Sequence, residues 1–427
     1  DLQRSQWLSA EEIVRVQKPL LERLVRHAAA QTDFYRERLA PLFGGADPAS
    51  ASIDLSRWSE VPVLRRQDAV DCLEQMKARS VPSDSGGARQ GESSGSTGRP
   101  FPHLRSSLAV RMANSLLERV YELFDVDLGG TLAHITLDRK QTCRYPAGGK
   151  FKGWNSHSPE ADLLVLDIGA SARDQLEWLE RVRADHVMTY PETLGEIAET
   201  AQAQGSPLRF RTFMSTGECL LPATAAKITQ TFGCRIVDVY GAREIGPIAF
   251  QCPDAGGYHA CAEALAVEFL DEEDRPVGPD EYGRVVVTSL YNYAMPFIRY
   301  DVGDYALASG ESCPCGRGLP WVQEIAGRTR NMFVMPDGSR RRWRGFVMAN
   351  MPRFLSYRQI QFVQATTDTI EVRYVPDSSA APPKIAELTE FLRQEFHPDL
   401  DVRTVAVDRI ERGAGMKTEQ FISHVAT

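Results

Sequence analysis

The chain of 427 residues lacks a long hydrophobic run. No apolar stretch approaches the roughly 20 residues that a membrane-spanning helix needs. The first residues, DLQRSQWLSAEE, also lack the basic and then apolar pattern of a secretory signal peptide. These two absences predict a cytoplasmic protein that has no membrane partner.

The chain also has fewer basic than acidic residues, and it has few cysteines. The formal net charge of -8 at pH 7 gives no electrostatic reason to expect a nucleic acid or an anionic membrane surface as partner. The eight cysteines are few for this length and do not suggest a disulfide scaffold. Cys313 and Cys315 stand out because they lie so close together in the sequence.

The composition is that of an ordinary globular protein, with 43% hydrophobic and 25% charged residues. A chain of this length is too long for one small core, so we expect two or more domains. Ser9 and Glu12 form a capping box in front of an apolar stripe, which predicts an amphipathic helix that reaches about Ala30.

The middle of the chain alternates between short apolar runs and helical patterns. The apolar runs are LAHITL, ADLLVLDIG, HVMTY, RFRTFMS and CRIVDVYG, and the helical patterns are RDQLEWLERVRAD and TLGEIAETAQAQ. This alternation is typical of an α/β sheet with covering helices. Further on, LAVEFLDEE and GRVVVTSLY flank a turn-rich stretch and predict an antiparallel hairpin or a small β-barrel-like region.

The C-terminal part has a pattern of its own. QIQFVQA and TIEVRYV predict two strands, a helix follows from about Pro383 to His397, and VRTVAV predicts a third strand. This order suits a compact α+β module. We place the boundary near Gly327 to Met332, which gives a large N-terminal domain, residues 1–328, and a small mobile C-terminal domain, residues 329–427.

The stretch GESSGSTGRP, Gly91 to Pro100, is too polar for a strand and too rich in glycine for a helix. Taken alone, the composition from Ser80 to Arg99 predicts a flexible loop. The alternative is a phosphate-binding loop, because successive Gly and Ser residues let backbone amides turn inward while hydroxyls and Arg99 add donors. It is not a Walker motif, since no Gly-Lys-Ser/Thr follows at the required spacing.

Further motifs follow this loop in order. They are STGE (Ser215 to Glu218), YGAREIG (Tyr240 to Gly246), RYDVGD (Arg299 to Asp304), GRTRN (Gly327 to Asn331) and GAGMKTEQFIS near the C-terminus. Together with SSGSTGRP, this set resembles the adenylate-forming superfamily of acyl-CoA synthetases, adenylation domains of peptide synthetases and luciferases. The phrases LVRHAAAQTDFYRERL, VPVLRRQD and CPCGRGLP resemble the phenylacetate-CoA ligase-like branch, and the resemblance spans essentially the whole chain.

The resemblance implies a binding site for ATP. The phosphate loop would consist of Ser93, Ser94, Gly95, Ser96, Thr97, Gly98 and Arg99. The ring of Tyr240 would pack on adenine and Gly241 would let the base approach, with Gly217 and Glu218 on the adenine side. Without the motif, Tyr240 would be interpreted as a core residue.

The resemblance also implies roles for four charged residues. Asp304, which follows a predicted strand and a glycine, would accept both ribose hydroxyls, with Arg328 in support. Glu244 would hold Mg²⁺, which neutralises charge as pyrophosphate leaves. Lys417 would swing over the reacting carboxylate and α-phosphate and act as a catalytic residue. Outside this context, Glu244 and Lys417 would be interpreted as solvated surface residues.

Four residues form a candidate zinc site. They are Cys252, His259, Cys313 and Cys315, and their side chains suit tetrahedral Zn²⁺. The spacing is irregular, and Cys261 competes for a place in the site. Some members of the resembling branch carry zinc at these positions, and a filled coordination shell would make the metal structural. The alternative is a set of unrelated buried thiols.

Some positions depart from the family pattern. Arg243 stands where a Ser or Thr usually contacts the α-phosphate, so the arginine either contacts phosphate, as a catalytic residue, or points away. Arg330 and Asn331 stand where the family usually has an acidic hinge residue. The resemblance therefore does not predict how the C-terminal domain rotates between the half-reactions. The basic run that starts at Arg340 is a solvated turn or, alternatively, a contact for a CoA phosphate.

The sequence therefore predicts an enzyme that uses ATP and Mg²⁺ to activate an aromatic or heteroaromatic carboxylic acid as an acyl-adenylate. The acyl group would then pass to the thiol of CoA. Transfer to an amine or to a carrier-protein thiol is an alternative, and so is a nucleotide-binding homologue that has lost catalysis. The identity of the acid and the oligomeric state, a homodimer included, stay open.

Overall fold

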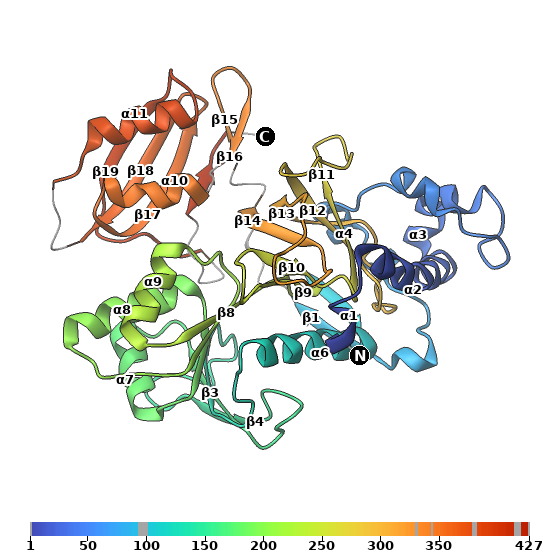
Figure 1. The fold of residues 1–427 in the computed structure, drawn as a ribbon, viewed down its shortest axis with the longest axis horizontal. Helices are drawn as coiled ribbons and strands as arrows, with labels where there is room; N and C mark the ends of the chain where they lie inside the picture. Colours follow the sequence, from blue (N-terminus) through green and yellow to red (C-terminus); the bar gives the residue numbers. More distant parts are fainter. Residues whose placement is uncertain are drawn as a thin grey trace.

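A computed structural model of the chain describes residues 2–92, 101–328, 332–342, 345–377, 382–413 and 420–425. Figure 1 shows a large N-terminal part and, above it, a smaller C-terminal part with its own sheet. We call the described residues from Met332 to Val425 the C-terminal module. The predicted boundary between residues 328 and 329 adjoins undescribed residues and stays a prediction. Within the described ranges, no helix is long and apolar enough to cross a bilayer.

A sheet of twelve strands forms the large part, in the order β11-β12-β13-β14-β10-β9-β8-β7-β6-β3-β5-β4. Its strands are β3 (Leu132–Thr136), β4 (Gly149–Lys152), β5 (Asp162–Asp167), β6 (His186–Thr189), β7 (Thr212–Ser215), β8 (Arg235–Ala242), β9 (Gly246–Gln251), β10 (Tyr258–Ala260), β11 (Leu265–Leu270), β12 (Tyr282–Ser289), β13 (Tyr300–Ala308) and β14 (Trp321–Arg328). The strands from β5 to β8 run parallel, and those from β9 to β11 pair antiparallel. The predicted α/β alternation and the predicted hairpin are therefore both confirmed, and they share one continuous sheet.

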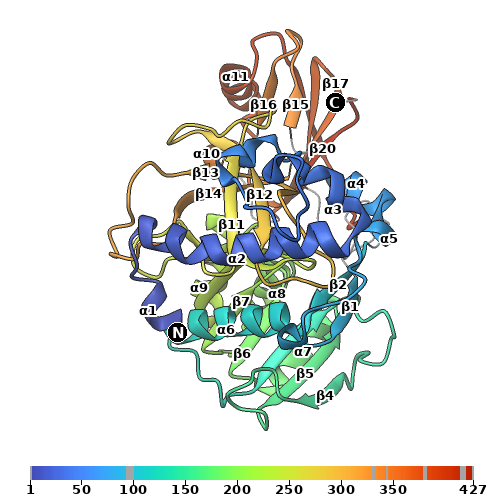
Figure 2. The same cartoon turned by 90° about the vertical axis from the view of Figure 1, so that its right-hand side faces the viewer.

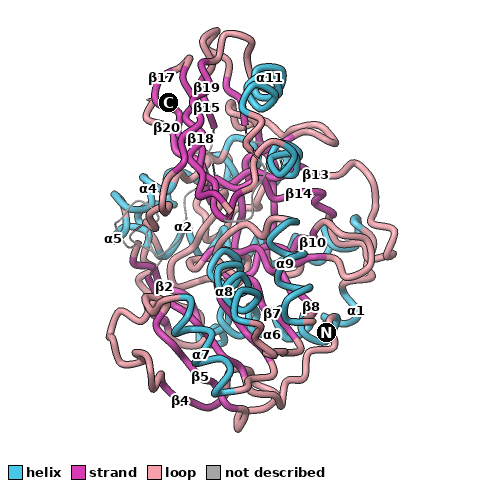
Figure 3. Tube along the Cα trace, turned by 90° about the vertical axis from the view of Figure 1, so that its left-hand side faces the viewer, coloured by secondary structure: helices cyan, strands magenta, loops and turns pink. Residues whose placement is uncertain are grey.

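Helices cover the parallel half because parallel strands need crossover connections. Figure 3 shows α7 (Ala172–Val182), α8 (Pro191–Gln204) and α9 (Pro222–Phe232) in front of these strands. They share a core with the sheet in which Trp178 and Phe232 are fully buried. This arrangement brings the loops that follow β6, β7 and β8 to one edge of the sheet, where open α/β sheets bind their ligands.

The antiparallel half curls into a barrel-like shape. A void of about 10 Å³ inside it is lined by residues of β8 to β12 and β14, among them Tyr240, Val267 and Val285. Outside, α2 (Ala10–Gln31) crosses these strands, as Figure 2 shows, and Gln17 donates to the carbonyl oxygens of Ala262 and Leu265. The predicted capping box at the start of α2 is present, which confirms the N-terminal helix.

A pair of short strands flanks the Gly- and Ser-rich stretch. β1 (Ala88–Glu92) pairs antiparallel with β2 (Pro102–Ser106), with Gly91 opposite His103. The prediction of a flexible loop from Ser80 to Arg99 is therefore wrong for residues 88–92. Most side chains of β1 are exposed, so hydrogen bonds to β2 rather than apolar burial form the strand, and composition carries no signal for that.

The C-terminal module has a four-stranded sheet in the order β19-β18-β17-β20. Its elements are β15 (Met332–Val334), β16 (Arg340–Arg342), α10 (Gly345–Asn350), β17 (Tyr357–Thr366), β18 (Thr369–Pro376), α11 (Ile385–Glu395), β19 (Asp401–Ala406) and β20 (Phe421–Ser423). The three predicted strands and the predicted helix are confirmed. The sequence did not reveal β15, β16 and β20, because strands of three residues are too short to show a period.

The remaining helices lie before the large sheet in the sequence. They are α1 (Leu2–Ser5), α3 (Asp33–Arg38), α4 (Arg66–Asp71), α5 (Leu73–Met76) and α6 (Ser107–Leu123). α6 and α2 contribute to the largest core cluster, which also contains Phe250 and Tyr300 of the sheet. α4 begins within the segment VPVLRRQD, and Leu64, just before the helix, forms an isolated bridge with Tyr300 of β13.

Candidate functional site

Two residues predicted for the nucleotide meet at the carboxyl end of β8. The hydroxyl of Tyr240 donates to Oδ2 of Asp304 over 2.8 Å. The prediction that Asp304 follows a strand is wrong, because the residue lies inside β13. The pairing of β13 with β12 shifts register at this point, and Gly303 has a φ of +80°, so a bulge takes Asp304 out of the ladder with β12. Arg328 is paired with Asp304 in the register of β13 and β14.

Gly241 has a structural reason to be glycine. A Cβ at this position would lie 2.5 Å from the carbonyl oxygen of Gly246, where β8 turns back into β9. Gly217 adopts a φ of +80°, a conformation that side chains disfavour. These constraints shape the loops beside Tyr240. The approach of a base to Gly241 and the adenine contacts of Gly217 and Glu218 stay predictions.

Glu244 is a buried carboxylate, with 4% of its side chain exposed. Its Oε1 accepts a hydrogen bond from the Tyr300 hydroxyl over 2.8 Å and pairs with Nη1 of Arg66 at 3.0 Å. Burial raises the pKa of Tyr300, so this phenol is protonated and donates. The interpretation as a solvated surface glutamate is wrong. Among the described residues none hydrogen-bonds Oε2, and a carboxylate oxygen of this kind fits Mg²⁺.

Arg66 is a site residue that the sequence analysis missed. It begins α4, and its guanidinium lies 5.3 Å from the centre of the Phe101 ring, the first described residue after the Gly- and Ser-rich stretch. Arg66 thus lies between Phe101 and Glu244. The sequence signal was the phrase VPVLRRQD, but its partner is 178 positions away, a distance that no local pattern spans.

Arg243 is exposed and has no hydrogen-bond or ion-pair partner in the described part of the chain. Its positive charge nonetheless affects the pKa of two residues in or next to the parallel strands. Burial first, and then Arg243, lowers the pKa of His134 in β3 to about 4, so the imidazole is neutral. Burial raises the pKa of Tyr190, which follows β6, and there the charges of Arg243 and Glu218 oppose each other. Arg243 directly follows β8, at the carboxyl end of that strand.

Several predicted residues lie outside the described part of the chain. These are Ser93, Ser94, Gly95, Ser96, Thr97, Gly98, Arg99, Arg330, Asn331 and Lys417. For Arg328, the register in β14 is described and the side chain is not. The roles of all these residues stay predictions.

The four residues of the candidate metal site come together. Ligand atoms of Cys252, His259, Cys313 and Cys315 all lie within 4.8 Å of one another. The Sγ atoms of Cys252 and Cys313 are 3.7 Å apart, and Sγ of Cys315 is 3.3 Å from Nε2 of His259. Tetrahedral zinc with its usual bond lengths would separate two sulfurs by about 3.8 Å, and a sulfur and a nitrogen by about 3.6 Å.

The donors of this Cys3His cluster also have a suitable chemistry. Burial lowers the pKa of His259 to about 4, which keeps the imidazole neutral as a metal ligand must be. Burial works to raise the pKa of Cys315, but hydrogen bonds from Arg317 lower it. Cys261 is fully buried and is not a member of the cluster, which settles the competition for the fourth place. The cluster could bind a metal, and it ties the turn after β9 to the loop before β14.

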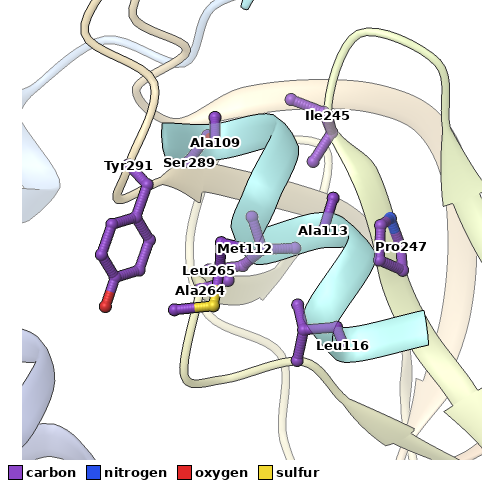
Figure 4. A pocket seen from close by; sticks show the side chains of 10 residues that line it. All are labelled: Ala109, Met112, Ala113, Leu116, Ile245, Pro247, Ala264, Leu265, Ser289 and Tyr291. Carbon is purple, nitrogen blue, oxygen red and sulfur yellow. The ribbon is translucent and has the colours of Figure 1, made fainter. Parts of the chain in front are cut away.

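A second cavity of about 10 Å³ lies between α6 and the sheet. Figure 4 shows its lining, which consists of Ala109, Met112, Ala113, Leu116, Ile245, Pro247, Ala264, Leu265, Ser289 and Tyr291. Space of this size holds about one water molecule. The cavity is therefore too small for a carboxylic acid substrate.

Comparison with known proteins places this geometry in context. No protein-family model matches the chain. It is 25% identical over 339 residues to a phenylacetate-coenzyme A ligase of Thermus thermophilus, which covers 77% of this chain and 73% of the relative. It is 24% identical to a phenylacetate-coenzyme A ligase of Pseudomonas putida, over 74% of this chain and 71% of the relative.

Solved structures agree over more of the chain. A 2-hydroxyisobutyryl-CoA ligase in the postadenylation state superposes with a TM-score of 0.77 and 18% identity, covering 98% of this chain and 91% of that one. The same ligase in the thioesterification state gives a TM-score of 0.62 at the same coverage. A benzoate CoA ligase from Burkholderia xenovorans LB400 gives 0.53 with 16% identity, over 75% of this chain and 66% of that one. The chain is thus a distant homologue of the phenylacetate-CoA ligases and has the fold of the adenylate-forming CoA ligases.

Proposed function

We propose that this protein activates a carboxylic acid with ATP and Mg²⁺ and transfers the acyl group to the thiol of CoA. A carboxylate oxygen attacks the α-phosphorus of ATP, the bond to the bridging oxygen breaks and pyrophosphate leaves. The thiolate of CoA then attacks the acyl carbon, and AMP leaves with the electron pair of the broken carbon–oxygen bond. The contact between Tyr240 and Asp304 carries this proposal.

That contact prepares a carboxylate for a ribose. Tyr240 donates to one oxygen of Asp304, which fixes the orientation of the carboxylate before a ligand arrives. A carboxylate fixed in this way can accept hydrogen bonds from two neighbouring hydroxyls. Both residues lie where β8 and β13 approach the carboxyl edge of the parallel strands. The adenine and ribose would therefore bind above β8.

Glu244 and Arg66 suit the phosphate end of the nucleotide. Mg²⁺, when bound, neutralises the charge that develops on pyrophosphate. Glu244 would hold it through Oε2, since Oε1 is already engaged by Tyr300 and Arg66. Arg66 would donate to phosphate oxygens from the side of Phe101, and Lys417 would act on the reacting carboxylate.

The acid would bind at the carboxyl ends of β3 and β6. Tyr190 follows β6 at this end, His134 lies in the middle of β3, and the charge of Arg243 affects the pKa of both. An arginine without a described partner can receive the substrate carboxylate or the α-phosphate. We propose an aromatic or heteroaromatic acid, because the curated relatives are named as phenylacetate-coenzyme A ligases. We further propose that the Cys3His cluster holds a structural zinc.

Exchange of radiolabel between pyrophosphate and ATP tests the first half-reaction. The panel contains phenylacetate, benzoate, a heteroaromatic acid and 2-hydroxyisobutyrate, and CoA is added in a second series. We expect exchange with an aryl acid and a CoA thioester in the second series. A hydroxamate or amide formed only with added amines would favour the amide ligase, and nucleotide binding without exchange for any acid would contradict the proposal.

A further inference from the structure

The first turns of α8 contact the C-terminal module. Glu196 uses both of its carboxylate oxygens for this contact: Oε2 accepts from Nη2 of Arg412 at 2.6 Å, and Oε1 accepts from Nε2 of Gln359 at 2.9 Å. Nη1 of Arg412 also donates to Oγ1 of Thr193 over 3.3 Å. Glu196 thus joins a helix of the large sheet to two separate segments of the module.

A second acid on α8 repeats the contact. Nε2 of Gln420 donates to Oε1 of Glu192 over 3.1 Å. Glu192 and Glu196 are four positions apart on a helix, so they present their carboxylates on the same face. Arg412 and Gln420 stand on either side of residues 414–419 in the sequence, the stretch that contains Lys417. The described residues next to both ends of that stretch therefore contact the same helix.

This contact is more than a loose surface pair. Only 16% of the Arg412 side chain and 31% of the Glu196 side chain are exposed. Gln359 is held in turn, because its Oε1 accepts from the backbone N–H of Ile410 over 3.0 Å. Beside the polar contacts, Leu221 of the large part packs against the apolar core of the module. Breaking such a contact leaves a partly buried charge without its partner, which costs more than breaking an exposed pair.

We propose that Glu192 and Glu196 form a docking pad for Arg412 and Gln420, and that this docking holds the C-terminal module in the orientation used for adenylation. The proposal rests on the proposed function. Figure 1 shows α8 and α9 directly beneath the module. The arrangement is supported by the better superposition on the 2-hydroxyisobutyryl-CoA ligase in the postadenylation state than in the thioesterification state.

The docking pad acts through other residues. Glu192 and Glu196 touch the module and position it, while the reacting atoms would be contacted by Lys417 and by the residues at the sheet edge. A positioning role of this kind should affect one half-reaction, because the proposal assigns the second one to a different orientation of the module, as the lower superposition on the thioesterification state of the 2-hydroxyisobutyryl-CoA ligase suggests. Loss of the pad should therefore lower kcat for adenylation and leave the KM for ATP and the transfer of a preformed acyl group unchanged.

The test compares the two half-reactions in Glu196→Gln and Arg412→Met. Removing a hydrogen bond to a charged group predicts a fall in kcat for acid-dependent ATP–pyrophosphate exchange of roughly tenfold or more. Conversion of synthetic acyl-adenylate to thioester with CoA should stay within about twofold of wild type, a margin small against an effect of that size. The double variant Glu196→Arg with Arg412→Glu should recover exchange relative to either single change, because the pair is restored with reversed charge.

Glu199→Gln is the matched control. Glu199 lies on the same helix and pairs with Lys227 of α9, so the variant removes an acid without touching the module. It should leave both half-reactions unchanged. Equal losses in both half-reactions for Glu196→Gln, or a failure of the double variant to recover exchange, would overturn the proposed role in adenylation.

Hydrogen–deuterium exchange separates this proposal from the proposed function, since it needs no turnover. Residues 405–413 and 357–363 should exchange faster in Glu196→Gln and in Arg412→Met than in wild type, and at the wild-type rate in Glu199→Gln. If wild type shows no acid-dependent ATP–pyrophosphate exchange, the proposed function fails and the amide data alone decide whether the pad exists. Unchanged amide exchange in both variants would overturn the docking pad.

Discussion

The hydroxyl of Tyr240 donates to the carboxylate of Asp304 over 2.8 Å and links β8 to β13 at the edge of the sheet where the nucleotide is proposed to bind. The parallel half of the sheet supplies the tyrosine, and the bulge in the antiparallel half supplies the aspartate. The site is thus built where the two halves of one continuous sheet join, and its geometry depends on both.

Asp304→Ala should weaken ATP binding, because two ribose hydroxyls lose a charged acceptor. A hydrogen bond to a charged group contributes about 1.5–3 kcal/mol, so the net loss of one such bond should raise the Kd roughly tenfold to a hundredfold. Tyr240→Phe keeps the ring and loses the donor to Asp304, so its effect should be smaller. Isothermal titration calorimetry with ATP measures both, and an unchanged Kd for Asp304→Ala would remove that residue from the site.

Lys417→Ala should abolish adenylation while the second half-reaction continues. A cation that stabilises developing charge contributes about a hundredfold or more to the rate. Lys384→Ala is the control, since Lys384 is an exposed lysine that pairs with the equally exposed Glu387 on the module surface. ATP–pyrophosphate exchange and thioester formation from synthetic acyl-adenylate are measured side by side. Undiminished exchange in Lys417→Ala would refute the catalytic assignment.

The Cys3His cluster should hold one zinc ion in each chain. Cys313→Ser together with Cys315→Ser removes two donors and should abolish metal binding and lower the Tm, because bound metal stabilises only the folded state. Cys261→Ser is the matched control, since Cys261 is a buried cysteine outside the cluster. Elemental analysis and thermal unfolding report both effects. Protein purified without a chelator and free of metal would contradict the zinc assignment.

The docking pad should weaken as the pH rises. Burial first, and then the neighbouring Glu218 and Glu196, raise the pKa of Glu192 to about 7, and Lys227 and Arg412 oppose this rise. A raised pKa in the docked state favours the protonated acid. The stabilisation is therefore complete below the ordinary value of 4.5 and is lost as the pH rises through about 7.

Amide exchange of residues 405–413 at pH 6 and pH 8 measures this dependence after correction for the intrinsic exchange rate. We expect less protection at pH 8 in wild type. In Glu192→Gln the protection should be the same at both values, because the amide does not titrate. A pH dependence that persists in Glu192→Gln would assign the effect to another group, and Tyr357, which also senses the charge of Glu192, would be the first to test.

The sequence predicted those parts of the molecule that local patterns encode. The capping box of Ser9 fixed the start of α2, and apolar runs of four to eight residues gave the strands around β8. Motif order gave Tyr240 and Asp304, but the bulge that places Asp304 inside β13 depends on the register with β12, which has no local signature. The composition of β1 pointed to a loop because its stabilising hydrogen bonds come from β2.

Local sequence patterns did not predict the contacts between distant segments. Arg66 meets Glu244 across 178 positions, and Arg412 meets Glu196 across 216. The phrase VPVLRRQD marked the segment of Arg66, but nothing in the sequence around either arginine indicated its partner. Cys252, His259, Cys313 and Cys315 could be grouped by residue type, but only the fold separates them from Cys261. The sequence thus predicted which side chains could bind a ligand or a metal, but it did not predict which distant residues those side chains contact.

Transfer of ¹⁸O from the carboxyl group of the acid tests the acyl-adenylate most directly. In a reaction with doubly labelled acid, ATP and CoA, the carboxylate oxygen that attacks the α-phosphorus leaves with AMP. Mass spectrometry should therefore find one labelled oxygen in AMP and the other in the thioester. Label in inorganic phosphate with ADP as the nucleotide product, or unlabelled AMP alongside thioester, would contradict the account.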